Sequence, residues 1–138
     1  MRTYNLFISH SWHYEDSYTQ LIELLDNASY FDYRNFSVPK DNSIKIHNSR
    51  YYETELRNKI AEKMKPCSVI LILAGVYATY SKYINIEIEV AKELGKSIIA
   101  IEPWGSERTS LTVKINSNKI VKWNTNSIVN AIKEVCLI

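Results

Sequence analysis

Two continuous apolar runs, joined by an amphipathic segment, set the strongest limit on what this chain can fold into. The runs are residues 68–74 (SVILILA) and 97–101 (SIIAI), and residues 83–94 between them have helical periodicity. A strand without polar alternation is buried on both faces, which is typical of parallel sheets. Gly95 follows the helical segment, where glycine commonly ends a helix. The pattern therefore predicts a strand, a crossover helix and a second, parallel strand.

The rest of the chain continues this alternation of short apolar runs and amphipathic segments. Further strands are predicted at residues 4–9, near 36–38 and at 119–123, and further helices at 15–28, 52–64 and 126–135. Together they predict a flavodoxin-like, three-layer α/β sandwich, in which a central parallel five-stranded sheet carries helices on both faces. We expect residues 1–138 to form this single domain. Residues 103–118 show no clear pattern, and we assign them no role.

Composition excludes several classes of function. A net charge of +2 is too small to indicate nucleic-acid binding, although basic residues gather between positions 34 and 65. No apolar stretch approaches the roughly 18 residues of a membrane span, and no signal peptide precedes the first strand. Cys67 and Cys136 form no CxxC motif, which fits a reducing compartment. We therefore expect a cytoplasmic protein that binds neither membranes nor nucleic acids.

Sequence motifs for common cofactors and metals are missing. There is no GxGxxG loop, no GxxxxGK[ST] loop, no HExxH motif and no cluster of Cys and His. A phosphate-accepting receiver domain would need acids where the first and third strands end, but Ser-His-Ser and Ala-Gly stand there. We therefore expect no metal site, no cofactor bound by a glycine-rich loop and no phosphate-receiver chemistry.

The first predicted strand ends in an unusual polar stretch, residues 7–12 (FISHSW). Side chains alternate across a strand, so Ser9 and Ser11 point one way and His10 the other. His10 is therefore badly placed to activate either serine as a nucleophile, and no GxSxG elbow is present. The two serines suit hydrogen bonding to one ligand. Capping of the following helix is the alternative that the sequence leaves open.

Glu87 is a charged residue on the side of a predicted helix that is otherwise apolar. On a helical wheel for residues 83–96, it falls near the middle of the apolar arc, whereas Glu89 lies on the polar side. Burying a lone carboxylate costs free energy unless hydrogen bonds or a cation compensate. Two explanations remain open: a structural acid paired with a nearby hydroxyl or arginine, or a carboxylate at the rim of a ligand cleft.

A single carboxylate among hydroxyls limits the reactions that are possible. Ordinary glycoside cleavage uses two carboxylates, one of which protonates the leaving oxygen. The nicotinamide group of NAD departs as a neutral molecule and needs no general acid. One carboxylate could then orient the ribose hydroxyls and stabilise the oxocarbenium-like transition state. A lone carboxylate is therefore compatible with NAD as the substrate, but these residues do not select NAD among substrates.

Segments 4–12 (YNLFISHSW) and 68–101 resemble the TIR-like domains of bacteria, with the closest likeness to the Thoeris anti-phage group. The resemblance covers roughly residues 3–102. It implies that NAD is a substrate, cleaved at the nicotinamide–ribose bond to give a hydrolysed, cyclised or conjugated ADP-ribose that acts as a signal. It also implies a separate effector protein that senses this product, and self-association through the loop at residues 37–50.

The resemblance carries over to individual residues. Glu87 corresponds to the catalytic glutamate, and Phe7 and Ser9 to a Phe-x-Ser element that borders the substrate pocket. Ser81 and Tyr83 match the serine and the aromatic residue that precede the glutamate, although the family usually has tryptophan where Tyr83 stands. With Ser11, which shares the direction of Ser9, these are the predicted substrate-binding residues: Phe7, Ser9, Ser11, Ser81 and Tyr83.

Two other functions remain open at this point. Many TIR domains are non-enzymatic adaptors that act by self-association, and the tyrosine-rich composition would suit such contacts. A nucleoside deoxyribosyltransferase-like enzyme would use a similar fold and a carboxylate nucleophile on nucleosides.

Overall fold

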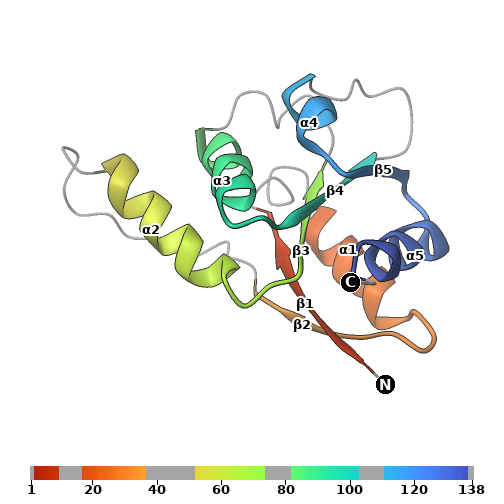
Figure 1. The fold of residues 1–138 in the computed structure, drawn as a ribbon. Coiled ribbons are helices and arrows are strands. Elements are labelled where there is room, and N and C mark those ends of the chain that lie inside the picture. The colour runs from red at the N-terminus through yellow and green to blue at the C-terminus, as the bar shows by residue number, and fades with distance from the viewer. Residues whose placement is uncertain (1, 10–16, 37–51, 74–81, 103–110, 137–138) are drawn as a thin grey trace.

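A parallel five-stranded sheet forms the centre of the protein. The structure is a computed structural model that describes residues 2–9, 17–36, 52–73, 82–102 and 111–136. The strands are β1 (Thr3–Ile8), β2 (Asp32–Asn35), β3 (Val69–Leu73), β4 (Ser97–Glu102) and β5 (Lys119–Lys122), in the order β2-β1-β3-β4-β5. Every neighbouring pair runs parallel. The predicted flavodoxin-like α/β fold is therefore confirmed (Figure 1).

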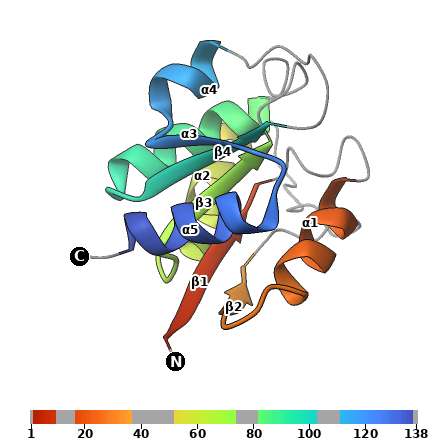
Figure 2. The same cartoon turned by 90° about the vertical axis from the view of Figure 1, so that its right-hand side faces the viewer.

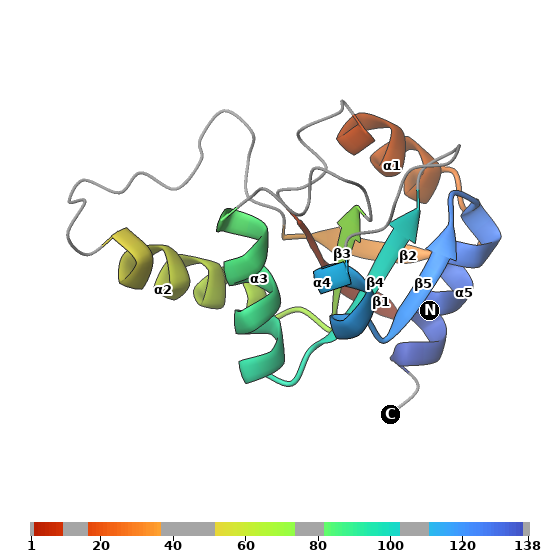
Figure 3. The same cartoon turned by 90° about the horizontal axis from the view of Figure 1, so that it is seen from above.

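Helices cover both faces of the sheet. They are α1 (Ser17–Asp26), α2 (Tyr52–Met64), α3 (Lys82–Glu93), α4 (Leu111–Asn116) and α5 (Thr125–Val135). Figure 2 shows α1 and α5 in front of the sheet, with α2 and α3 behind it. Seen from above, α3 lies between the strands and α2 (Figure 3). The three layers follow from the right-handed crossovers that parallel strands require.

The hydrophobic core is divided in two by the alternation of side chains along each strand. On β1, Phe7 belongs to the half beneath α2 and α3, whereas Leu6 and Ile8 belong to the half beneath α1 and α5. Every residue of β3 is buried. This explains the uninterrupted apolar run in the sequence, because a central parallel strand meets helices on both faces.

Two elements differ from the sequence prediction. We expected the second strand near residues 36–38, but β2 occupies Asp32–Asn35, and residues 37–38 lie outside the described part of the chain. The strand was missed because it is a largely exposed edge strand with polar residues. Helix α4 lies in the 103–118 stretch, which shows no clear sequence pattern. Six residues are too few to establish helical periodicity.

The remaining boundaries lie close to the prediction. Helix α2 matches the predicted 52–64, and β1 begins and ends one residue earlier than predicted. Helix α5 begins after Asn124, whose side chain accepts a hydrogen bond from the backbone N–H of Ser127 at 3.1 Å. This N-cap fixes the start of the helix. Among the helices of the described residues, none is long and apolar enough to cross a lipid bilayer.

Both cysteines are buried and free. Burial raises the pKa of the Cys67 thiol to about 12, against a smaller opposing effect of the Lys96 charge. Burial also raises the pKa of Cys136, with Arg2 lowering it. The folded protein therefore holds both thiol protons more tightly than the unfolded chain does.

This difference predicts slow thiol chemistry and a stability that falls at alkaline pH. In a Cys136→Ala background, Cys67 should react with a thiol reagent at pH 8 on the order of 100-fold more slowly than in urea-unfolded protein. The contribution of Cys67 to the free energy of unfolding should be fully present below the thiol's unfolded-state pKa of about 8.5. It should be lost as pH rises toward the folded-state pKa, because the unfolded chain releases the thiol proton first. Urea titrations at pH 7.5 and 10, with and without Cys67→Ala, measure this contribution. Equal labelling rates in folded and unfolded protein would contradict it.

Candidate functional site

The site is a buried contact between the end of β1 and the middle of α3. The Oγ of Ser9 donates a hydrogen bond of 2.7 Å to Oε1 of Glu87, across 78 positions of sequence. Both side chains have an exposed fraction of 0%. They are the two buried polar residues among those that the structure describes. A hydroxyl that donates to a carboxylate makes one of the shorter and stronger hydrogen bonds in proteins.

The strand determines where Ser9 points. Ser9 is two residues after Phe7, so the alternation along β1 turns both side chains toward the α2 and α3 face of the sheet. The backbone N–H of Ser9 donates to the carbonyl oxygen of Leu71 on β3 at 2.9 Å. The last hydrogen bond of the ladder therefore fixes the residue at the carboxyl end of β1. This edge is where ligands bind in open α/β sheets.

The phase of helix α3 determines where Glu87 points. Its neighbours in the apolar arc are buried as the wheel predicted; these are Ile84, Ile86, Ile88, Val90 and Ala91. Glu89, two residues further on, is exposed. Of the structural partners that the sequence allowed for Glu87, the structure provides a hydroxyl, that of Ser9.

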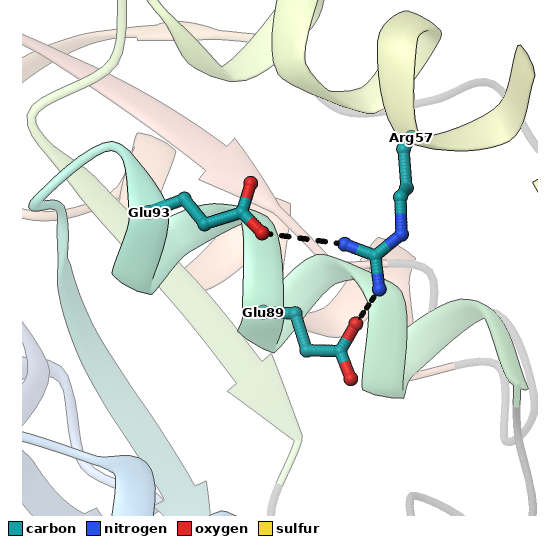
Figure 4. Close-up of polar contacts among 3 residues, drawn as sticks. All are labelled: Arg57, Glu89 and Glu93. Carbon is teal, nitrogen blue, oxygen red and sulfur yellow. Dashed lines mark hydrogen bonds and ion pairs between the residues drawn. The ribbon is translucent and has the colours of Figure 1, made fainter. Parts of the chain in front are cut away.

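The outer face of α3 carries a second group of acids with a different role. Arg57 of α2 forms ion pairs with Glu89 and Glu93, the latter at 3.5 Å (Figure 4). Glu89 and Glu93 are four residues apart and therefore lie on the same side of the helix. The arginine joins α2 to α3 on the face opposite Glu87. Pairs this exposed contribute little free energy.

The Arg57 contact was not predicted from the sequence. Arg57 is one of the basic residues that gather between positions 34 and 65, and it pairs with acids of the same chain. The available signal was the i, i+4 spacing of Glu89 and Glu93 on the polar side of the wheel. It indicates a neighbouring cation without identifying which one.

The other predicted site residues have different outcomes. Phe7 lies wholly inside the core, with an exposed fraction of 0%, two residues before Ser9. Ser11 and Ser81 lie outside the described residues, and Tyr83 belongs to α3 but its side chain is not described. The structure thus brings Ser9 and Glu87 together. The substrate-binding roles of Phe7, Ser9, Ser11, Ser81 and Tyr83, and the catalytic role of Glu87, stay predictions.

Chemically, the pair provides a carboxylate whose orientation is fixed by a hydroxyl. Glu87 and Ser9 each make further interactions besides their mutual hydrogen bond. Within the described ranges, no group of three or more His, Cys, Asp or Glu residues is placed to hold a metal ion. A held carboxylate at the carboxyl edge of the sheet can bind hydroxyl groups and stabilise positive charge that develops beside it.

Comparison with known protein families places this fold and site in context. The model of the Thoeris protein ThsB, TIR-like domain, matches residues 7–108, which include both Ser9 and Glu87. The chain belongs to this family of TIR-like domains. The family resemblance found in the sequence is thereby confirmed.

Among solved structures, this TIR-like domain is similar to the CMP N-glycosidase BcmB of Clostridium botulinum. The two chains share 16% sequence identity with a TM-score of 0.50, over 94% of this chain and 98% of that one. At this identity the likeness establishes a common fold. No curated protein sequence matches the chain.

The buried pair predicts a measurable energetic coupling. Ser9→Ala removes a hydrogen bond from a fully buried carboxylate and should lower the free energy of unfolding by about 1–3 kcal/mol. The combined Ser9→Ala and Glu87→Ala variant should be less destabilised than the sum of the two single variants, by about 0.5–3 kcal/mol. Urea unfolding of the four proteins measures this double-mutant cycle. Strictly additive effects would show that the pair does not interact in solution.

Proposed function

We propose that this TIR-like domain cleaves the nicotinamide–ribose bond of NAD, with Glu87 as the catalytic carboxylate. The observation that carries the proposal is the hydrogen bond between Ser9 and Glu87 at the carboxyl edge of the sheet. Two residues that the sequence selected independently, one by strand alternation and one by helical phase, meet there. Membership of the Thoeris family supports a role in anti-phage defence.

The reaction needs only what one carboxylate can supply. Nicotinamide leaves with the bonding electron pair and becomes neutral, so that positive charge develops on the ribose. The Glu87 carboxylate can accept hydrogen bonds from the ribose hydroxyls and stabilise this charge. Water then adds to the anomeric carbon and loses a proton, which gives ADP-ribose. A nucleophile from the adenine end of the same molecule would instead give a cyclic product.

Ser9 has a positioning role in this proposal. Its hydroxyl holds one oxygen of the carboxylate, and its own backbone is held by Leu71 on the neighbouring strand. The carboxylate is thereby kept in one orientation before substrate arrives. Such preorganisation lowers the barrier because little rearrangement is needed during the reaction.

The burial of Ser9 and Glu87 implies that the access of substrate to the carboxylate is controlled. Both side chains have an exposed fraction of 0% in this structure. Substrate can therefore contact Glu87 only after the groups that shield it have moved. We infer a low basal activity and an activated form in which the carboxylate is accessible. The NAD-derived product would act on a separate effector protein in the cytoplasm, and the loop at residues 37–50, outside the described residues, would contribute to self-association.

Replacement of the carboxylate by an amide tests the catalytic role. Glu87→Gln keeps the shape of the side chain and an oxygen that can accept the Ser9 hydrogen bond, but removes the negative charge. Release of nicotinamide from NAD should fall by roughly 100-fold or more. Glu89→Gln, a change of the same kind on the exposed side of the same helix, is the matched control and should retain most of the activity.

The assay compares purified wild-type and variant proteins, and also lysates from phage-challenged cells that express them, by chromatography of nicotinamide and ADP-ribose products. Release at the same rate by wild type and Glu87→Gln would overturn the assignment. An absence of nicotinamide release by the wild type in both settings would favour the adaptor function.

A second candidate is cleavage of a nucleotide N-glycosidic bond, which the similarity to a CMP N-glycosidase favours. The two candidates break the same kind of bond but differ in the leaving group. Cytosine leaves less readily than nicotinamide, because it is not already positively charged, and it benefits from a proton donor. With one acid in the described site, we expect nicotinamide release from NAD to exceed cytosine release from CMP by at least about 10-fold. Parallel incubations with each substrate measure this ratio, and a ratio below one would favour the CMP activity.

A further inference from the structure

A groove at the end of helix α2 is lined by chemical groups that the proposed reaction does not use. It has a volume of about 480 Å³, and its walls are formed by Phe36, Lys59, Glu62, Lys63 and Pro66. Pockets of this size that combine apolar walls with a few polar groups are typical of small-molecule sites. The groove is thus large enough for a small organic ligand.

The groove lies apart from the candidate catalytic pair. Phe36 directly follows β2, and its backbone N–H donates to the carbonyl oxygen of Leu6 on β1 at 2.9 Å. Ser9 comes three residues after Leu6, which corresponds to about 10 Å of extended chain. Pro66 belongs to the connection that leads from α2 into the amino end of β3. The groove therefore belongs to the amino half of the sheet, whereas Ser9 and Glu87 meet at the carboxyl edge.

The two lysines of the groove place their charges side by side. Lys59 and Lys63 are four residues apart on α2, so they lie on the same side of the helix. Both are exposed, and within the described part of the chain neither ammonium group is paired with a carboxylate. Two neighbouring cations without an acidic partner repel each other and attract an anionic group such as a phosphate.

These lysines are not needed to complete the end of the helix. Cations commonly gather at a helix C-terminus because the last carbonyl groups lack partners there. In this protein those carbonyl oxygens already accept hydrogen bonds from other groups; they belong to Ala61, Lys63, Met64, Lys65 and Pro66. Lys59 also lies more than one turn before Met64, where α2 ends. A ligand is therefore the better explanation for the two unpaired charges.

The remaining groups of the groove fit the other parts of a nucleotide. Phe36 packs against the core on one side and also lines the groove, so its ring offers an apolar surface on which a base can stack. Glu62 is exposed and carries the one acid of the lining. A carboxylate repels a phosphate, but it can accept hydrogen bonds from the hydroxyl groups of a ribose.

We propose that this groove binds a nucleoside phosphate, with the base on Phe36, the ribose hydroxyls on Glu62 and the phosphate on Lys59 and Lys63. A simple inorganic anion would meet the Glu62 carboxylate and leave the aromatic wall unused. An uncharged nucleoside would leave both lysines unused. The proposal is independent of the catalytic role of Glu87.

Titration with adenosine monophosphate (AMP) and its fragments tests the ligand class. Amide signals of α2, followed by NMR of isotope-labelled protein, should give a Kd for AMP on the order of 0.1–1 mM, because the polar groups of the groove are exposed. Adenosine and inorganic phosphate should each bind roughly 10-fold more weakly or less, since each contacts only part of the groove. An AMP titration without saturation up to about 10 mM would overturn the proposal. Phosphate that binds as tightly as AMP would overturn it too.

Substitutions separate the individual contacts. Lys59→Gln and Lys63→Gln should each weaken AMP binding by roughly 3-fold or more, but leave adenosine binding unchanged. Glu62→Gln should weaken AMP binding by roughly 3-fold, but leave 2′,3′-dideoxy-AMP unaffected because this ligand lacks the ribose hydroxyls. Lys114→Gln removes an exposed lysine of α4, away from the groove, and is the matched control that should bind AMP like the wild type.

A final comparison separates the groove from the candidate catalytic pair, because AMP is also a part of NAD. Glu87→Gln should bind AMP with the wild-type Kd, as read from the α2 amide signals. Ligand-dependent shifts confined to the surroundings of Ser9 and Glu87 would overturn the proposal. The same holds for an unaltered AMP affinity in both lysine variants. Thermal unfolding of each variant shows whether a loss of binding comes from a loss of the fold.

Discussion

The architecture of the candidate site depends on one buried hydrogen bond, from Ser9 to Glu87. A carboxylate with no exposed surface is tolerated in a small domain only if polar groups replace the water that it has lost. Ser9 supplies one of these groups directly after a strand whose last three residues, Leu6, Phe7 and Ile8, are buried in the core. The bond thus joins β1 to α3 at the edge of the sheet where this fold class binds ligands. Burying Glu87 at this position costs free energy, and stability alone would favour an apolar residue there.

Helix α3 carries glutamates with different roles on its two faces. On its inner face, Glu87 has an exposed fraction of 0% and accepts the Ser9 hydrogen bond. On its outer face, Glu89 and Glu93 are paired with Arg57 of α2. The outer pairs are exposed and contribute little to stability. The rotation of the helix about its axis is set by its buried apolar face, which includes Ile84, Ile88 and Ala91.

The proposed catalytic site lies at the carboxyl edge of the sheet, and β1 carries Ser9 to that edge. The same strand also supports β2, since β1 pairs with β2 from Thr3 to Leu6. On its other side, β1 pairs with β3 from Leu6 to Ile8, so the residues that precede Ser9 are held between two strands.

The sequence by itself determined the buried strands, the phase of α3 and the family. Uninterrupted apolar runs identify β3 and β4 because a strand between two helical layers has no face for polar residues. The helical period predicts that Glu87 faces inward, and the alternation along a strand predicts that Ser9 and Phe7 share one face. Sequence periodicity did not locate β2 or α4. An exposed edge strand and a six-residue helix bury too few apolar side chains to produce a recognisable pattern. Only the tertiary structure decided that Ser9 and Glu87 are partners. Their contact depends on how α3 packs across the sheet onto the end of β1, and packing between segments 78 residues apart is not encoded in any local period.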